Sequence, residues 1–313
     1  MKTIFLKDGA QGMLPCVATI GFFDGVHRGH RYLIDRVVEL ARAEGLRSAV
    51  ITFEDHPRQV LQQDYQPKLL TTFEEKTFLL SHTGVDYCVV FPFNSETATM
   101  NARQFMEEVL CHQLNVRRLV VGYDHRFGRD RSEGFEDYVR YGHELGITVE
   151  KGHAVTFHGQ RVSSSLIRQY LAEGEVELAA ECLGYPYTLV GRVVEGKQLG
   201  RKLGFPTANI EIDKDKLLPA PGVYAVKARR EHSIEMRRAM MNIGVRPTFG
   251  GDKLSLEIHI FDFDEEIYGE LLLVQFIHRL REERRFDSVE ELSQQLQADE
   301  RLVVEQFEKE MEE

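Results

Sequence analysis

The chain has 313 residues, more than one hydrophobic core usually contains, so two domains are expected. Its 39 basic and 50 acidic residues give a formal net charge of −11, which argues against a binder of nucleic acid or of anionic membranes, because such proteins need a basic face. The four cysteines are scattered without a Cys-x-x-Cys pair, which indicates free thiols and disfavours a zinc site. The N-terminal stretch Met1–Asp8 is too short and too polar for a signal peptide. No apolar run approaches the ~20 residues that span a bilayer. The sequence therefore predicts a cytoplasmic protein.

Apolar strands and helical patterns alternate along the chain up to about residue 183. The expected strands are Val17–Ile20, Ala49–Phe53, Tyr87–Phe91, Leu119–Gly122 and Val149–Val155. The expected helices are Tyr32–Ala43, Phe73–Ser81, Ala102–Gln113 and Phe135–Leu145. This alternation predicts βαβ units and a parallel, doubly wound sheet, whose ligands bind beyond the carboxyl ends of the strands.

The run from Gly21 to His30 follows the first of these strands and leads into a helix. A helix N-terminus presents unpaired N–H groups and a partial positive charge, so it favours phosphate. Gly29 lets a ligand approach the backbone closely, and the imidazoles of His27 and His30 can donate hydrogen bonds to phosphoryl oxygens. A surface helix start that happens to carry two histidines is the alternative. The three glycines and the turn at Asp24, between a strand and a helix, favour a nucleotide-phosphate site.

Three further segments lie near the carboxyl ends of strands, namely Thr52–Pro57, Gly122–Gly128 and Val162–Arg168. The serines of the last segment are good helix caps, which is their structural role. A serine cluster at a helix N-terminus with an arginine one turn further also suits phosphate. Because the histidine motif lies on the same sheet edge, phosphate binding is favoured.

After a short helical stretch at Val176–Leu183, the pattern changes to short strands separated by turns with glycine and proline. A first strand opens after Gly184, and the others are Val223–Ala228, Met240–Ile243, Leu254–Phe261 and Leu271–Ile277. This pattern is typical of a compact antiparallel barrel or sandwich. A helical stripe that includes Val289, Val303 and Phe307 closes the chain, and we expect it to pack on the barrel.

A loop rich in glycine and basic residues follows the first strand of this second half. The residues of interest in it are Gly196, Gly200, Lys202 and Gly204. Such a loop suits phosphates, although it is not a Walker A loop, and a plain surface loop is the alternative. Thr207 and Asn209 follow two residues apart, so in extended chain they present two oxygens on one side. Magnesium takes few protein oxygens and completes its octahedron with water and nucleotide phosphates.

Glu257 lies on the polar face of the expected strand Leu254–Phe261. A carboxylate on such a face, near a phosphate site, can take the proton from a substrate hydroxyl. Position alone favours the alternative, a solvated glutamate on a strand.

The run Gly21-Phe-Phe-Asp-Gly-Val-His-Arg-Gly-His30 resembles the His-x-Gly-His signature of the nucleotidyltransferase superfamily, and its flanks resemble the flavin-adenylylating branch. The three later segments are similar to the Thr-Phe-x-Pro-His-Pro, Gly-x-Asp-Phe-x-Phe-Gly and Ser-Ser-Thr-x-Ile-Arg motifs of bacterial flavin adenylyltransferases. Three positions depart from those motifs. Asp55 replaces a proline, His125 a phenylalanine and Ser165 a threonine, and only Ser165 keeps the chemistry of the family residue.

The second half resembles riboflavin kinase in segments that follow that family's order. They are Gly204–Asn209, Leu218–Tyr224, Asn242–Phe249, the Glu257 strand, Tyr268–Gly269 and Arg281–Phe286. Both halves together resemble the bifunctional bacterial riboflavin kinase and FAD synthetase over essentially the full chain. The resemblance implies a Rossmann-like nucleotidyltransferase domain with a parallel sheet over residues 1–183. It also implies a riboflavin-kinase-like antiparallel β-barrel with a closing helix over residues 184–313.

By this resemblance, the barrel transfers the γ-phosphate of ATP to the 5′-hydroxyl of riboflavin and produces FMN. Glu257 would be the base, Thr207 and Asn209 would help hold Mg²⁺, and the glycine-basic loop would cover the ATP phosphates. Arg281 would contact the flavin or order the neighbouring loop.

The first domain would join FMN to AMP from a second ATP, so that FAD forms and pyrophosphate leaves. His27 and His30 would stabilise charge on the phosphates without a protein nucleophile. The residues that would hold the pyrophosphate region are Ser164, Ser165 and Arg168. Those that would position nucleotide or flavin are Gly21, Phe22, Asp24, Gly29 and Asp124.

Two other functions fit parts of the pattern. A nucleotidyltransferase for a different phosphorylated acceptor would explain the histidine motif but not the kinase-like half. A catalytically silent flavin-binding regulator is disfavoured, because His27, His30, Asn209 and Glu257 are all present. ATP, riboflavin and FMN are the expected small-molecule partners, without nucleic acid or membrane, and we expect a monomer or a weak homo-oligomer.

Overall fold

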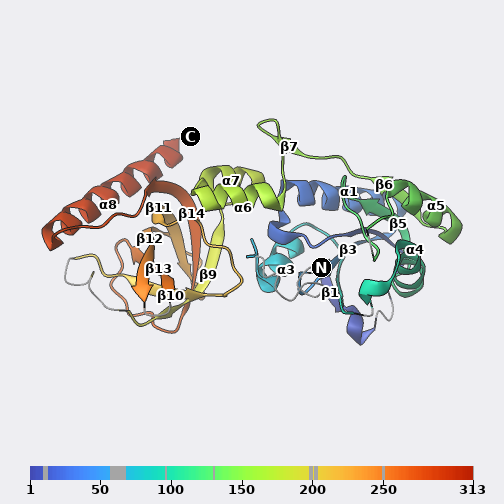
Figure 1. Ribbon diagram of the computed structural model, residues 1–313, viewed down its shortest axis with the longest axis horizontal. Coiled ribbons are helices and arrows are strands. Elements are labelled where there is room, and N and C mark those ends of the chain that lie inside the picture. The colour runs from blue at the N-terminus through green and yellow to red at the C-terminus, as the bar shows by residue number, and fades with distance from the viewer. Residues whose placement is uncertain are drawn as a thin grey trace. The chain divides into compact units, whose positions relative to one another are not determined.

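The computed structural model describes residues 1–9, 13–56, 68–95, 97–129, 131–196, 200, 204–248 and 251–312. The chain forms two compact units, Met1–Ser164 and Ser165–Glu313 (Figure 1). This division groups helices α6 (Ser164–Glu173) and α7 (Val176–Leu183) mainly with the second unit. The sequence-based boundary after residue 183 stays a prediction.

The first unit contains a six-stranded sheet in the order β1-β4-β3-β2-β5-β6, and every neighbouring pair is parallel. The strands are β1 (Lys2–Phe5), β2 (Cys16–Ile20), β3 (Arg47–Phe53), β4 (Tyr87–Phe91), β5 (Val116–Val121) and β6 (Thr148–Lys151). The parallel, doubly wound sheet predicted from the alternating pattern is therefore confirmed. Strand β2 lies inside the sheet, between β3 and β5. All five of its residues are buried, as expected for a parallel strand that is covered on both faces.

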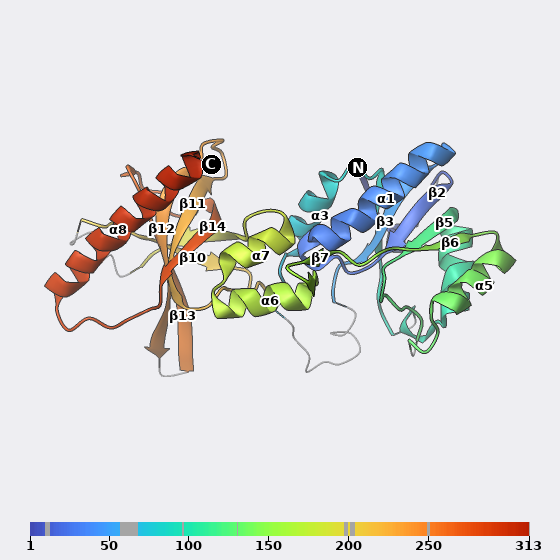
Figure 2. The same ribbon diagram turned by 90° about the horizontal axis from the view of Figure 1, so that it is seen from above.

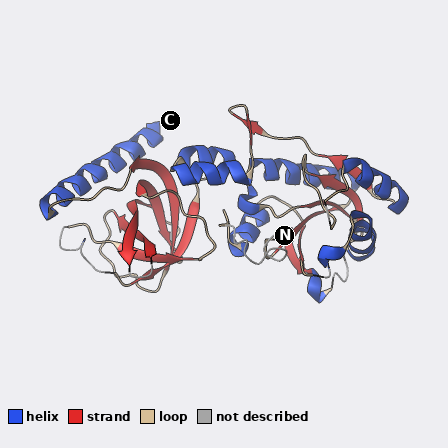
Figure 3. Cartoon of the chain, in the orientation of Figure 1, coloured by secondary structure: helices blue, strands red, loops and turns tan. Residues whose placement is uncertain are grey.

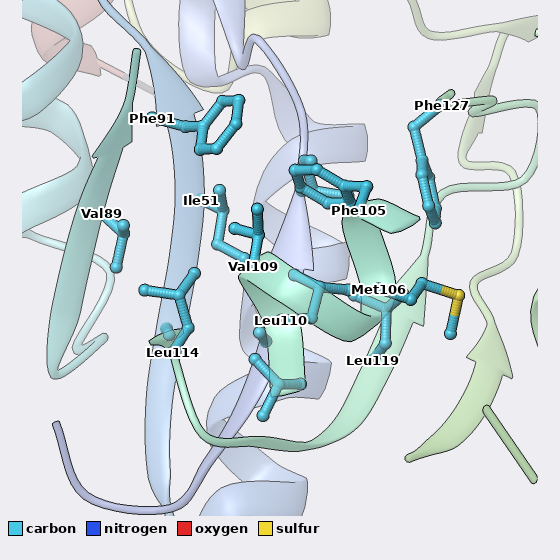
Figure 4. Packing of buried hydrophobic residues seen from close by; sticks show 14 of the residues in the cluster. Ile51, Val89, Phe91, Phe105, Met106, Val109, Leu110, Leu114, Leu119 and Phe127 are labelled. Carbon is cyan, nitrogen blue, oxygen red and sulfur yellow. The ribbon is translucent and has the colours of Figure 1, made fainter. Parts of the chain in front are cut away.

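Helices cover both faces of this sheet. The main helices are α1 (Arg28–Glu44), α3 (Phe73–Ser81), α4 (Ala102–Gln104), the π-helix η4 (Phe105–Gln113) and α5 (Phe135–Leu145). Figure 2 shows α1 lying along the sheet, where Ile34 and Val37 pack against Val17 of β2. On the opposite face η4 covers the sheet, and its side chains meet those of β3, β4 and β5 in the cluster of Figure 4. Alternate residues of one strand thus serve two separate cores.

One expectation for this unit was wrong. The last strand ends at Lys151 and not at Val155, because its partner β5 ends at Val121, opposite Lys151. A short antiparallel pair, β7 (Thr156–Phe157) and β8 (Gln160–Arg161), follows. The strand β1 was not expected, and it pairs in parallel with β4 at the sheet edge.

The second unit is a closed antiparallel barrel in the order β10-β13-β12-β11-β14-β9, whose ends β10 and β9 also pair. Its strands are β9 (Thr188–Val194), β10 (Ala208–Ile212), β11 (Gly222–Arg230), β12 (Arg237–Thr248), β13 (Gly251–Ile260) and β14 (Leu271–Arg281). The predicted choice between barrel and sandwich is thereby decided for the barrel (Figure 3).

The closing helix α8 (Val289–Glu312) packs on the outside of this barrel, as its apolar stripe predicts. Val303 and Phe307 are buried there against Val223 and Ala225 of β11 and Met240 of β12. Burial of this stripe covers one side of the barrel and leaves the polar faces of β10 and β13 for other roles.

Candidate functional sites

In the first unit, the strand order reverses beside β2, since β3 flanks it on one side and β5 on the other. Ligands of open α/β sheets bind at such a switch point, outside the carboxyl ends of the strands. The run Gly21–His30 follows β2, and the segment Gly122–Gly128 follows β5. The sheet therefore brings together two of the segments singled out from the sequence.

His27 and His30 form a stacked pair at the start of α1. His27 is the N-cap of the helix, and its Nδ1 accepts a hydrogen bond from the His30 N–H at 3.3 Å. The two rings stack with centroids 3.6 Å apart, and the ring of His27 is buried. Since Nδ1 accepts, the proton of the neutral His27 ring lies on Nε2.

Burial keeps two imidazoles of this region neutral. Burial, with smaller contributions from His27, His125 and Lys76, holds the pKa of His30 well below its usual range. Burial and the nearby Arg131 lower the pKa of His125 to about 4. A neutral imidazole has one N–H to donate and carries no charge that would repel the cationic groups around it.

Gly29 and Gly21 make room for aromatic rings. A Cβ on Gly29 would lie 3.2 Å from the ring of His27, and a Cβ on Gly21 would lie 3.1 Å from the ring of Phe23. Between them, Phe23 and Val26 adopt positive φ angles of 55° and 35°, which non-glycine residues rarely do. Strain of this kind gathers at functional turns.

The carboxylate of Asp24 is buried and is occupied by the protein itself. It accepts hydrogen bonds from the N–H of Leu70, the N–H of Thr71 and Thr71 Oγ1, at 3.0 to 3.2 Å. Thr71 Oγ1 also accepts from the N–H of Gly25. Asp24 therefore fixes the turn from within.

Ser164 and Asp124 also bond to the protein. Ser164 Oγ donates to the carbonyl oxygen of Asp24 at 3.0 Å, which joins the start of α6 to the turn. Asp124 is largely exposed and pairs with Arg161 of β8 at 2.9 Å. Ser165 and Arg168 continue α6 within the second unit.

An aromatic cavity of ≈ 560 Å³ opens near the switch point. Its aromatic lining consists of Phe22, Phe53, Phe91, Phe93, Phe105 and Phe127. The polar part of the lining includes two histidines and three arginines, namely His56, His125, Arg126, Arg129 and Arg131. A cavity of this size with aromatic walls and a few cationic groups suits a flat heteroaromatic ligand that carries negative charge.

The two departures from the adenylyltransferase motifs that change the chemistry of the family residue, His125 and Asp55, lie in different places. His125 lines the aromatic cavity, and its buried Nε2 has no hydrogen-bond partner within the described part of the chain. Asp55 lines a separate, smaller hollow together with Lys7. Of the two, His125 is the one beside the expected ligand.

In the second unit, strand register brings Asn209, Glu257 and Asn242 side by side. Asn209 of β10 lies opposite Glu257 of β13, and Glu257 lies opposite Asn242 of β12. Directly opposed residues of antiparallel strands project to the same face. The neighbours Ile210 and Ile258 are buried on the other face. Sequence reasoning missed Asn242, although a polar residue within the apolar run Met240–Ile243 was a visible signal.

The glycine loop lies directly against these groups. A Cβ on Gly196 would lie 2.0 Å from the side-chain nitrogen of Asn209, and a Cβ on Gly200 would lie 3.4 Å from Thr207 Oγ1 and 2.2 Å from Phe205 O. Gly204 has a φ of +82° with open space around it. Lys202 lies outside the described residues. Gly196, Gly200, Thr207 and Asn209 therefore form one cluster beside Glu257.

A hollow of ≈ 460 Å³ borders this cluster. Its walls include Thr207 and Ala208 at the start of β10, Ile258 of β13 and Tyr268 in the turn before β14. The imidazole of His259 bonds to Pro206 O at 2.8 Å and so holds the segment before Thr207 against β13. Ala208 and Ile258 project to the opposite face of their strands from Asn209 and Glu257, so the hollow meets the cluster at Thr207 and lies mainly on the other face.

Comparison with known proteins finds a matching family for each half of the chain. The FAD synthetase family model matches residues 11–166, and the riboflavin kinase family model matches residues 183–307. Bifunctional riboflavin kinase/FMN adenylyltransferases of Haemophilus influenzae and Escherichia coli are each 38% identical to this chain, over 91% of it and 92% and 90% of theirs. The Bacillus subtilis enzyme is 36% identical over 93% of this chain and 92% of its own. This chain belongs to the bifunctional riboflavin kinase/FMN adenylyltransferase family.

A solved structure described as a macrolide-efflux protein from Streptococcus pneumoniae is also similar, with a TM-score of 0.88 and 33% identity. The similarity covers 97% of this chain and 99% of that one. That description does not apply to this chain, because both halves of this chain match families of flavin enzymes. In the described residues, none of the helices is both long and apolar enough to cross a membrane.

The side chain of Arg281 is engaged in an ion pair within the second unit. Its guanidinium forms a bidentate pair with Asp299 of α8, at 2.8 to 3.1 Å, and the Asp299 side chain is fully buried. Gln295 donates to the same carboxylate at 2.7 Å. Arg281 therefore fastens α8 to β14.

The described residues contain no cluster of three or more His, Cys, Asp or Glu side chains that could hold a metal ion by themselves. The oxygens of Thr207 and Asn209 beside the glycine loop still fit Mg²⁺, which binds few protein ligands where nucleotide phosphates supply the others. The expected donor set is thus compatible with the structure.

Proposed function

We propose that this chain phosphorylates riboflavin to FMN with ATP and then adenylylates FMN to FAD with a second ATP. The observation that carries the proposal is the presence of two separate sites suited to phosphate in one chain. One is the Asn209–Glu257 pair under the glycine loop, and the other is the stacked His27–His30 pair at a helix N-terminus.

In the phosphorylation step, the Glu257 carboxylate takes the proton of the riboflavin 5′-hydroxyl. The freed oxygen bonds to the γ-phosphorus, the bond from that phosphorus to the β–γ bridging oxygen breaks, and ADP leaves. Thr207 and Asn209 would hold Mg²⁺, which neutralises charge on the phosphates when bound. The glycine loop, with Gly196 and Gly200, covers the ATP phosphates.

In the adenylylation step, a phosphate oxygen of FMN attacks the α-phosphorus of ATP while the bond to pyrophosphate breaks. His27 and His30 donate hydrogen bonds from neutral rings to the oxygens that gain charge. Ser165 and Arg168 hold the leaving pyrophosphate. The route needs no covalent enzyme intermediate.

The aromatic cavity is the proposed flavin site of the first unit. The phenylalanine rings would stack on and enclose the isoalloxazine ring, and the arginines of the lining would face its phosphate end. The enzyme would act in the cytoplasm on small molecules, without nucleic acid, as a monomer or a weak homo-oligomer.

Incubation of riboflavin with ATP and magnesium, followed by chromatography, tests the proposal. The wild-type protein should produce FMN and then FAD. His30→Ala should stop at FMN, because the charge on the transferred phosphate loses a donor. Asn209→Ala should form no FMN from riboflavin but should still convert added FMN to FAD.

Failure of the wild-type protein to form either product would remove the enzymatic proposal. Loss of adenylylation of added FMN in Asn209→Ala would contradict the division into two sites. Product from a different phosphorylated acceptor, with FMN inert, would favour another nucleotidyltransferase activity.

A further inference from the structure

Lys76 is a lysine buried in the first unit, on the inner side of α3, with only 2% of its surface exposed. Its Nζ donates a hydrogen bond to the carbonyl oxygen of Phe53, the last residue of β3, at 2.7 Å. Lysine side chains are almost never this buried unless their ammonium group is paired with another group. Lys76 is not among the site residues predicted from the sequence.

The same ammonium group lies over the ring of Phe22, 4.0 Å from its centroid, and 5.6 Å from the centroid of Phe73. The face of an aromatic ring attracts a cation, most strongly where water is excluded. Phe22 belongs to the turn after β2, and both Phe22 and Phe53 line the aromatic cavity. One ammonium group thus joins two strand ends that form adjoining parts of the cavity wall.

Burial lowers the pKa of Lys76 to about 8. Asp24, Cys88 and Asp55 oppose this shift, and His30 is the other titratable group that senses the charge. Burial raises the pKa of Cys88 to about 11 and keeps that of His30 well below its usual range, so both are neutral from pH 7 to 9.5. Lys76 therefore loses its charge within a pH range in which Cys88 and His30 both stay neutral.

We propose that Lys76 is a positioning residue of the adenylylation site, whose ammonium group holds Phe22 and the end of β3 in the arrangement that receives the flavin. The inference rests on the proposed assignment of the aromatic cavity to FMN. It predicts a defect in FMN binding, because Lys76 acts on the cavity wall and not on the reacting phosphates.

The dependence of the FMN KM on pH tests this role in the full-length protein. Between pH 7 and pH 9.5 the KM for FMN should rise at least fivefold, with a midpoint near pH 8, while the kcat for FAD formation changes less than twofold. The phosphate of FMN titrates near pH 6, outside this range. A KM that stays constant over the range would overturn the proposal.

Lys76→Met keeps most of the side-chain volume and removes the charge. Its KM for FMN at pH 7 should be at least fivefold above that of the wild type and should no longer depend on pH between 7 and 9.5. Lys7→Met is the matched control, because Lys7 also lies over a ring, that of Phe5 at 5.4 Å, but is exposed. That control should keep the wild-type KM and its pH dependence.

Phe22→Leu provides a second measurement if Lys76→Met does not fold. Without the ring, the charged form of Lys76 is less stable, so the midpoint of the KM profile should move below pH 8. An unchanged midpoint would contradict the role given to the ammonium–ring contact. Riboflavin phosphorylation, followed in the same samples, should be unaffected in every variant.

The result separates the two proposals. If the wild-type protein forms no FAD, the proposed function fails. If FAD forms but KM is insensitive to both pH and Lys76→Met, only the role of Lys76 fails.

Discussion

In the first unit, the groups proposed to face phosphate come from connections, whereas in the second unit they come from the strands themselves. His27 and His30 lie at a strand-to-helix turn whose shape is held by Thr71 and Ser164, two residues far from it along the chain. Asn209 and Glu257 face one another because two strands are paired in register. The geometry of a site made from connections depends on many long-range contacts. The geometry of a site made from strands depends on the hydrogen bonds that pair those strands.

The two sites also differ in how closely the backbone is approached. In the first, Gly29 accommodates the ring of His27, a side chain of the same turn. In the second, Gly196 accommodates Asn209, a side chain of the next strand. Substitutions at these points therefore damage different reactions, which makes the comparison testable.

The largest effect is expected from Arg281→Met. This change leaves the fully buried carboxylate of Asp299 without its cationic partner, which should cost the barrel about 3–5 kcal/mol. Urea unfolding of the full chain, followed by hydrogen exchange of peptides from β11 and β14, measures the loss.

The double variant Arg281→Met/Asp299→Leu is the control, because it removes both charges and should recover most of the stability. Adenylylation of added FMN should continue in both variants. Equal destabilisation of the single and double variants would show that packing, and not the ion pair, fastens α8.

An intermediate effect is expected from Gly196→Ala. The new Cβ would overlap the amide of Asn209, so phosphorylation of riboflavin should fall at least ~100-fold, or about 2.7 kcal/mol of transition-state stabilisation. Gly204→Ala is the matched control in the same loop, since its Cβ meets open space and strains only a φ of +82°. That control should retain phosphorylation within about fivefold, and similar losses in both variants would contradict the steric explanation.

The smallest effect is expected from the acid response of the first unit. The folded pKa of His125 is about 4, below its unfolded value, so the unfolded chain takes up its proton first as the pH falls. Stability is thus fully present above pH 6.5 and is lost toward pH 4, by about 2 kcal/mol at pH 5 for this residue.

His125→Phe should remove this part of the pH dependence and make the loss of stability between pH 7 and pH 5 smaller. Hydrogen exchange of peptides from β2 and β5 at the two pH values measures it. An equal loss in the variant would show that His125 is accessible to protons in the folded state.

The sequence predicted what depends on local pattern. The buried run before Gly21 and the helical spacing after Arg28 identified β2 and α1, since periodicity reports which face is buried. The alternation around Glu257 identified β13 and its polar face. Patterns shorter than this, such as the edge strand β1, left no clear signal.

What could not be predicted depends on partners far away in the chain. The Gly21–Asp24 turn was expected to position nucleotide or flavin, and the hydrogen bonds that the Asp24 carboxylate accepts from Leu70 and Thr71 to hold this turn are contacts that no local pattern encodes. Arg281 was expected to contact the flavin or to order the neighbouring loop, and its partner Asp299 appears in the sequence as one more acidic residue of a charged helix. The roles of the remaining site residues stay predictions.

The closure of the barrel has a consequence for how this enzyme can vary. Because β10 pairs with both β9 and β13, sliding it by one residue would break two ladders at once and would turn Asn209 away from Glu257. The alignment of these two side chains is therefore independent of the lengths of the loops that join the strands. Insertions and deletions can accumulate in those loops and alter access to the substrates while the distance between the paired side chains stays constant.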